Sequence, residues 1–288
     1  MTDQKVAFVT GASRGIGRAA ALALAEAGFD VAVSSRTVKE GEGRTEASSV
    51  RDDEASLALP GSLQTTAAEI EGRGRRALVV PLDLLDVDAL HAAPRHVLEE
   101  WERIDVLVNN AIYQGLGTMD RVLDLTAENM TKLVLGNYVH QVLLTQPVVQ
   151  HMLERGSGRV INMISGSARL DPPAPPGEGG WGVAYSASKA AFARVAGGIN
   201  AEFSGRGVVA YNVDPGNVIT EKRKAQHPDD PYQEKFGAAP AEATGRVIAW
   251  LASSDEASRF LGKWIYAPKL CADLGLLPGW ASQEPAGT

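Results

Sequence analysis

Three features that are scarce or missing in the sequence exclude whole classes of protein. Cys271 is the only cysteine among 288 residues, so no disulfide can form within the chain. No apolar run reaches the length of a membrane span, and the first residues lead into a strand without a signal-peptide pattern. Basic residues do not predominate, since the net charge is −7. We therefore expect a cytoplasmic protein that binds neither nucleic acid nor membrane.

The remaining composition is that of an ordinary globular chain, with 44% hydrophobic residues, 22% charged residues and 30 glycines. Short apolar segments alternate with helical patterns along it. This alternation predicts a single α/β domain over residues 1–288, built as a Rossmann-type doubly wound parallel sheet with helices on both faces. Four segments lie outside that pattern: a surface insertion at 37–63, two substrate loops at 170–182 and 221–240, and a tail at 268–288.

A glycine-rich turn follows the first expected strand, residues 6–10, and leads into an alanine-rich helix. Glycines allow a tight turn and let a pyrophosphate approach the amino end of a helix, where free N–H groups favour anions. Doubly wound folds bind dinucleotides at this first junction between strand and helix. The turn therefore predicts a dinucleotide site formed by Gly11, Ser13, Arg14, Gly15, Ile16 and Gly17.

The second expected strand, residues 31–34, is followed by Ser35 and Arg36 and lacks the acid that NAD-selective sites place there. Arg36 and Arg14 could instead clamp a 2′-phosphate, with each charge-assisted hydrogen bond contributing about 1.5–3 kcal/mol. This pattern favours NADP(H), with NAD(H) as the alternative. Each arginine could equally be a solvated surface charge.

Polar residues also stand at the ends of the next two expected strands, 77–81 and 106–109. Asp83, followed by Leu84, could accept a hydrogen bond from an adenine amino group or cap the next helix. Asn110 and Ala111 follow Asn109, and consecutive asparagines indicate either turn chemistry or a cofactor contact.

Two further polar positions fall where burial is expected. Asn137 lies on the apolar face of a helical pattern over 126–155, where it must be paired and could hold either a backbone segment or a water chain. Ser165 and Ser167 follow a buried strand, 159–164, and either hydroxyl could hydrogen-bond a carbonyl oxygen.

Tyr185 and Lys189 are four residues apart in a helical pattern, so their side chains share one face. An ammonium beside a tyrosine favours the phenolate, so Lys189 is expected to lower the pKa of Tyr185 toward a range useful for proton transfer. The alternative is the first turn of an amphipathic helix with a solvated lysine.

Taken together, these motifs resemble those of the short-chain dehydrogenase/reductase family over approximately residues 5–267. Thr10–Gly17 matches its TGxxxGIG turn, Asn109–Ala111 matches NNA of NNAG, and Tyr185 with Lys189 matches YxxxK. The chain departs from the family in three places. Ile112 replaces the glycine of NNAG, Ser165 and Tyr185 are farther apart than usual, and the last expected strand lacks a following glycine pair.

The resemblance implies an NADPH-dependent reductase of a small ketone or aldehyde, assembled as a homodimer or homotetramer and containing no metal. Tyr185 would donate the proton, Ser165 would orient the oxygen, Lys189 would hold the nicotinamide ribose, and Asn137 would complete a water route to solvent. Further cofactor contacts are implied for Pro215, Gly216, Val218 and Thr220. Two alternatives are an NAD-dependent alcohol dehydrogenase and a non-catalytic cofactor-binding regulatory protein.

Overall fold

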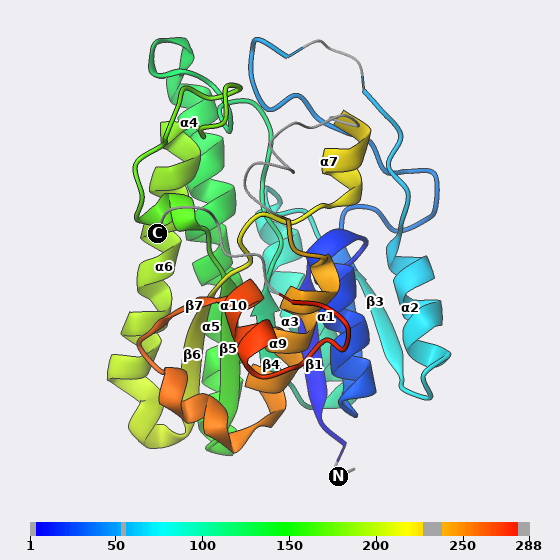
Figure 1. Cartoon of the computed structure of the whole chain (residues 1–288). Coiled ribbons are helices and arrows are strands. Elements are labelled where there is room, and N and C mark those ends of the chain that lie inside the picture. Colours follow the sequence, from blue (N-terminus) through cyan, green and yellow to red (C-terminus); the bar gives the residue numbers. More distant parts are fainter. Residues whose placement is uncertain (1–3, 53–55, 227–237, 282–288) are drawn as a thin grey trace.

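The computed structural model describes residues 4–52, 56–226 and 238–281. Its centre is a parallel sheet with the strand order β3-β2-β1-β4-β5-β6-β7 (Figure 1). The strands are β1 Val6–Thr10, β2 Asp30–Ser35, β3 Ala77–Pro81, β4 Val106–Asn109, β5 Gly158–Met163, β6 Val208–Asp214 and β7 Trp264–Tyr266. The predicted doubly wound sheet is confirmed.

Helices cover both faces of this sheet. They are α1 Gly15–Glu26, α2 Leu63–Glu71, α3 Val87–Trp101, α4 Ala127–Val134, α5 His140–Arg155, α6 Val183–Phe203, α7 Glu221–Gln226, α9 Ala241–Ser253 and α10 Ala267–Asp273. Short 3-10 turns occur at Val122–Asp124, Gly166–Ala168, Ser204–Arg206 and Asp255–Phe260.

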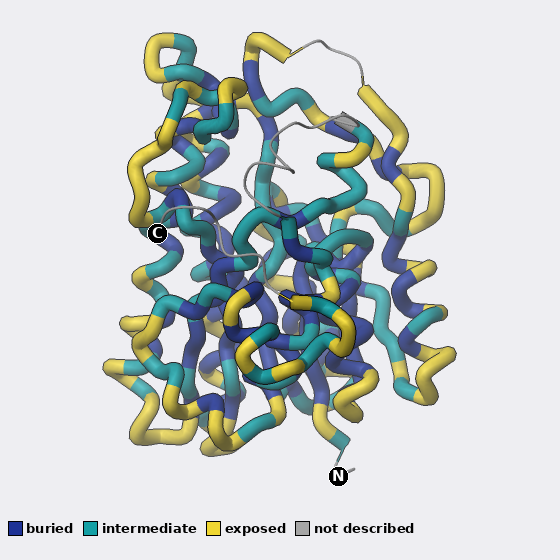
Figure 2. The backbone as a smooth tube through the Cα atoms, in the orientation of Figure 1, coloured by how far each residue is buried: buried dark blue, intermediate teal, exposed yellow. Residues whose placement is uncertain are grey.

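The two faces have separate apolar cores because alternate side chains of a strand point to opposite sides. Ala7 and Val9 of β1 pack with α1, α2, α9 and α10, whereas Val6 and Phe8 pack with α3, α5 and α6. Figure 2 shows the buried residues concentrated along the sheet and the inner sides of the helices. Strands buried on both faces explain the continuous apolar runs in the sequence.

The strand order reverses direction between β1 and β4, because the chain runs outward to β2 and β3 and then returns to the other side of β1. Crossovers that leave in opposite directions open a crevice outside the carboxyl ends of the two strands. The glycine turn after β1 and the asparagines after β4 therefore meet at this crevice.

The helical stretch predicted over 126–155 is interrupted by one wide turn. α4 passes into a π-helical segment, Leu135–Val139, and then into α5. Such turns accommodate one extra residue and are frequent at functional sites. Asn137 lies within this segment and is almost fully buried.

Two segments differ from the sequence prediction. Residues assigned to a tail from 268 onward begin as α10, with Pro268 in its first turn and Leu270 and Cys271 buried against α9. Proline is compatible with the first turn of a helix, where its missing N–H group would have no partner in the helix. The expected loop at 221–240 begins with the helix α7, and its residues 227–237 lie outside the described part of the chain.

Candidate active site

A cleft of about 330 Å³ lies at the carboxyl ends of β1, β2, β4 and β5. It brings together most of the residues that the sequence singles out. Those lining it are Gly11, Ser13, Arg14, Gly15, Ile16, Gly17, Arg36, Asp83, Leu84, Asn110, Ala111, Tyr185, Lys189, Pro215 and Thr220. Gly216 and Val218 are not among the lining residues, and neither are Asn137 and Ser165.

The glycine turn after β1 is held in a shape that only glycine fits. Gly11 has a φ of 69°, and a Cβ on Gly17 would lie 2.1 Å from the Gly11 carbonyl oxygen. Asn110 fixes the turn from the neighbouring strand, because its Nδ2 donates to the carbonyl oxygens of Thr10 at 2.9 Å and Gly11 at 3.2 Å. Asn110 therefore has the first of the two roles predicted for the consecutive asparagines, which is to stabilise the turn.

The amino end of α1 opens into this turn without a side-chain cap and without an acidic residue in its first turn. Its backbone N–H groups thus remain available to an anion, and the helix dipole favours one. The residues present therefore fit the pyrophosphate of a dinucleotide.

The two arginines predicted to clamp a 2′-phosphate have different surroundings. Arg14 donates to the carbonyl oxygens of Pro60 and Gly61, both at 2.9 Å, and to Thr37 Oγ1 at 3.3 Å. Its guanidinium therefore holds the two ends of the 37–63 insertion together. The side chain of Arg36 is more exposed than that of Arg14. Arg36 lines the cleft and forms an ion pair with Glu46 at 2.7 Å.

Residues 43–52 and 56–59 of the insertion, here called the cleft hairpin, form a short arm beside the cleft that is joined by the isolated antiparallel bridge between Arg44 and Ala58. Thr45 N donates to the Leu57 carbonyl oxygen at 2.8 Å, and Leu59 N donates to that of Gly43 at 2.9 Å. Arg44, Glu46 and Leu59 line the cleft. The segment predicted as a surface insertion therefore also contributes to the site.

Tyr185 lies in the first turn of α6, opposite the end of β5. Its hydroxyl hydrogen-bonds with Ser165 and Ser167, and Ser167 Oγ also donates to Ser165 Oγ at 3.0 Å. Both serines left open by the sequence thus reach the tyrosine. Burial raises the pKa of Tyr185, the two serine hydrogen bonds oppose the increase, and the Asp214 charge adds to it.

Lys189, one turn further along α6, is 5% exposed, and its Nζ donates to the Met163 carbonyl oxygen at 2.8 Å. Burial lowers the pKa of Lys189 to about 8, while the Asp214 carboxylate opposes this decrease. The sequence predicts that Lys189 lowers the pKa of Tyr185. In the structure burial is the largest cause of the shift, and the pKa of Tyr185 is raised instead.

Asn137 joins three parts of the site. Its Oδ1 accepts from Tyr113 N at 2.8 Å, and its Nδ2 donates to the Tyr113 carbonyl oxygen at 3.1 Å and to Ser188 Oγ at 3.3 Å. These bonds tie the segment after β4 to α6. They realise the first of its two expected roles, holding a backbone segment in place.

Four charged residues at or beside the site were not singled out from the sequence: Arg44, Glu46, Asp214 and Lys222. Asp214 ends β6, is 5% exposed, and accepts from Gly216 N and Trp264 Nε1, both at 3.0 Å. An acid at the end of a mostly apolar strand was the signal that could have identified it. Glu46 and Lys222 stand in polar segments where nothing distinguishes them from solvated charges.

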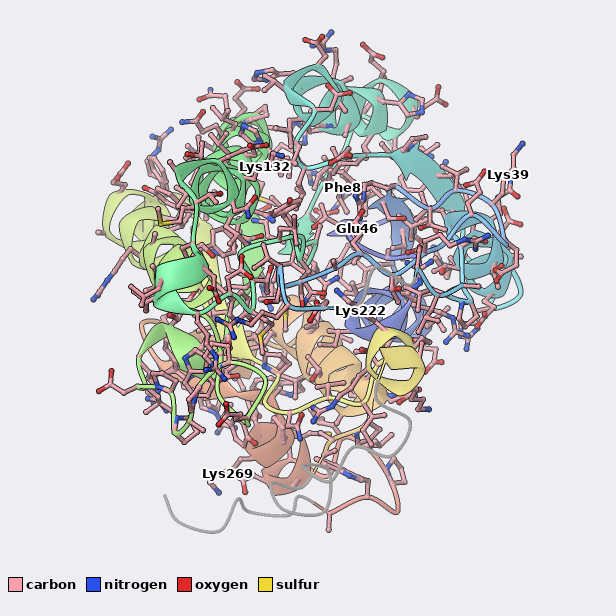
Figure 3. The ribbon with its side chains drawn as sticks, turned by 90° about the horizontal axis from the view of Figure 1, so that it is seen from above. Phe8, Lys39, Glu46, Lys132, Lys222 and Lys269 are labelled. Atoms are coloured by element: carbon pink, nitrogen blue, oxygen red, sulfur yellow. The ribbon has the colours of Figure 1, made fainter. Side chains whose placement is uncertain are left out.

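Lys222 Nζ donates to Gln114 Oε1 at 3.3 Å, and both residues line the cleft. Burial lowers the pKa of Lys222, and the nearby Glu46 carboxylate opposes this decrease. Viewed from above, Glu46 and Lys222 lie near the centre of the molecule, whereas Lys39 and Lys269 lie at its rim (Figure 3). The mouth of the cleft therefore carries charges of both signs.

Over residues 4–52, 56–226 and 238–281, no group of three or more histidine, cysteine, aspartate or glutamate side chains could hold a metal ion. Among the helices in those ranges, none combines the length and apolarity that a membrane span needs. Residues 170–182 are not among the residues lining the cleft. They contact the segment after β4, where Glu178 pairs with Arg121, and their role as a substrate loop stays a prediction.

Comparisons with known proteins agree with this geometry. A family model described as short chain dehydrogenase matches residues 5–59 and 55–231. A 3-oxoacyl-[acyl-carrier-protein] reductase of Synechocystis is 30% identical over 90% of this chain and 93% of its own length. A cyclohexanol dehydrogenase of Rhodococcus is 31% identical over 88% of this chain and 93% of its own length.

A solved structure from Beutenbergia cavernae that holds NADP at low occupancy superimposes with a TM-score of 0.72. It is 26% identical, and the match covers 91% of this chain and 94% of that one. Family model, relatives and fold agree. The chain therefore belongs to the short-chain dehydrogenase/reductase family, whose members use NAD(H) or NADP(H), and it is an oxidoreductase that acts on CH–OH or C=O groups.

Proposed function

We propose that this chain is an NADPH-dependent reductase of a ketone or aldehyde, with Tyr185 as the general acid. One observation carries the proposal: the Tyr185 hydroxyl lies within the serine pair of the β5 end, one helical turn from the buried Lys189. A bound nicotinamide would supply the hydride. The residues of the chain would orient the carbonyl, donate the proton and keep water out.

The raised pKa of Tyr185 supports its role as a proton donor. A phenol whose pKa is raised stays protonated at neutral pH and can donate to the oxygen that gains charge as a carbonyl is reduced. Ser165 and Ser167 would donate to the same substrate oxygen.

Lys189 and Asn137 would support the proton transfer without donating the proton to the substrate themselves. Lys189 is buried with its ammonium at the Met163 carbonyl oxygen, where it can also reach a ribose hydroxyl in the cleft. Asn137 fixes the backbone of Tyr113 and the hydroxyl of Ser188 next to that lysine. We assign Asn137 a positioning role in a water route to solvent through Lys189.

The preference for NADPH rests on the end of β2. No acid stands there to hold a ribose 2′-hydroxyl, and the Arg36 guanidinium lines the cleft at that end. Arg14 would contribute indirectly, because its hydrogen bonds to the insertion occupy its guanidinium. Asp83 and Leu84 line the same end of the cleft, where an adenine would lie.

The wider setting is proposed on the same basis: a cytoplasmic homodimer or homotetramer that takes a small carbonyl substrate and binds neither nucleic acid nor membrane. Exposed apolar side chains on α4 and α6 support an assembly through these helices, since Met130, Val134 and Val183 are 39–49% exposed. Gel filtration at the size of a monomer would contradict the assembly.

The test compares the wild type with Tyr185→Phe for NADPH oxidation on a panel of ketones, aldehydes and quinones, repeated with NADH. We expect the variant to lose about 10²- to 10⁴-fold in rate while still binding NADPH, because only the proton donor is removed. Tyr138→Phe is the matched control, since Tyr138 lies on the π-helical segment outside the cleft lining. Full activity of Tyr185→Phe would overturn the assignment.

A further inference from the structure

The cleft hairpin is fixed at both ends. At its base, Arg14 binds the carbonyl oxygens of Pro60 and Gly61. Toward its tip, Met119 N donates to the Ser48 carbonyl oxygen at 2.9 Å, and Val50 N donates to Asp120 Oδ1 at 2.7 Å. The segment after β4 forms the opposite side of the site, so the hairpin spans from the β2 end to the β4 end.

Glu46 is the acidic residue that this arm brings to the cleft. It lines the cleft together with Arg36, and the two side chains form an ion pair at 2.7 Å. The contacts that hold the hairpin involve its other residues, chiefly the backbone of Thr45, Ser48 and Leu59. The backbone position of Glu46 is therefore held by contacts other than its ion pair.

We propose that Glu46 is a specificity-determining residue that competes with the 2′-phosphate of the dinucleotide for Arg36. This inference rests on the proposed function, which gives Arg36 the phosphate. A 2′-phosphate must share or displace the Glu46 carboxylate, whereas a dinucleotide with a 2′-hydroxyl carries no charge there to compete. The hairpin thus supplies, from a loop, the negative charge that the end of β2 lacks.

The exposure of the pair decides how strong this competition is. The side chains of Arg36 and Glu46 are 53% and 43% exposed, and half-exposed ion pairs contribute little because water screens them. A phosphate offers up to three strong acceptor oxygens and about two charges, so it displaces the Glu46 carboxylate from the Arg36 guanidinium. Glu46 therefore reduces the preference for NADPH without abolishing it.

The experiment is a fluorescence titration of wild type and Glu46→Gln with NADPH and with NADH. The substitution keeps the size and removes the charge, so NADPH should bind about 3- to 10-fold more tightly and NADH nearly as before. The gain should shrink at high salt. Glu71→Gln, which removes the same charge from an exposed position on α2 outside the cleft lining, should change neither affinity.

A double-mutant cycle with Arg36→Ala shows whether the effect passes through the ion pair. In that background Glu46→Gln should no longer change the ratio of the two affinities. An unchanged ratio in the single variant would overturn the role of Glu46, and an equal gain with Arg36 absent would overturn its competition for Arg36. Binding is measured without turnover, so a protein that binds NADPH but reduces no carbonyl contradicts the proposed function alone. A wild type that binds neither dinucleotide overturns both.

Discussion

The Tyr185 end of the cleft and the cleft hairpin are built in opposite ways. Tyr185 and Lys189 stand on a helix of 21 residues, with Lys189 buried and both held by neighbours from the β5 end. Glu46 stands in an arm with a single isolated bridge and half-exposed charges. The proposed proton transfer needs fixed distances, and regular elements provide them. Selectivity between two similar cofactors needs only a modest charge, which a loop can supply.

The largest effect should come from removing the cation at the rigid end. Lys189→Met keeps an apolar stem of similar length, so α6 should stay folded, yet we expect reductase kcat/KM to fall about 10²-fold or more. Lys39→Met is the control, because Lys39 lies at the rim of the molecule (Figure 3). Equal losses of kcat/KM in the two variants would show that the buried position of Lys189 makes no specific contribution to activity.

A smaller effect should appear in the pH profile. The pKa of Lys189 is lowered to about 8, so its ammonium is present below that pH and is lost as pH rises through it. Activity that needs the ammonium should fall over the same range. The Asp214 carboxylate raises the pKa of Lys189, so in Asp214→Asn the fall should begin at lower pH.

If the substitution lowers that pKa by about one unit, activity at pH 8 drops about fivefold, while activity at pH 6 is unchanged. Rate profiles from pH 6 to 9, with thermal unfolding as a check on folding, measure the difference. A fall by the same factor at every pH would mean that Asp214 acts through its bonds to Gly216 and Trp264 rather than through its charge.

The smallest effect should come from loosening the hairpin. Arg51 pairs with Asp124 at 2.6 Å near the tip, with its side chain 58% exposed. Arg51→Ala should change the melting temperature by less than about 2 °C, because exposed ion pairs add little to stability. Hydrogen exchange of the Met119 and Val50 amides should nevertheless accelerate, since both bond across this contact. Faster exchange throughout α6 would show that the two regions are not separate.

The same contrast explains what the sequence could predict. The sheet, the glycine turn and the Tyr185 helix follow from local patterns, because apolar periodicity and glycine geometry are written in neighbouring residues. The hairpin contacts join residues about 70 positions apart, such as Val50 with Asp120 and Arg51 with Asp124. No pattern among neighbouring residues predicts these hairpin contacts. The pKa of Tyr185 was also mispredicted, because burial could not be weighed against one neighbouring charge.

The strand order has a consequence for how the chain comes together during synthesis. β1 pairs on one side with β2, the next strand to be made, and on the other with β4. The Thr10 hydroxyl, which donates to Val108 and accepts from Asn110 and Ala111, joins residues 98–101 positions apart. Until that part of the chain leaves the ribosome, the backbone N–H and C=O groups along one edge of the apolar strand β1 stay unpaired. A chaperone would be most useful during this period.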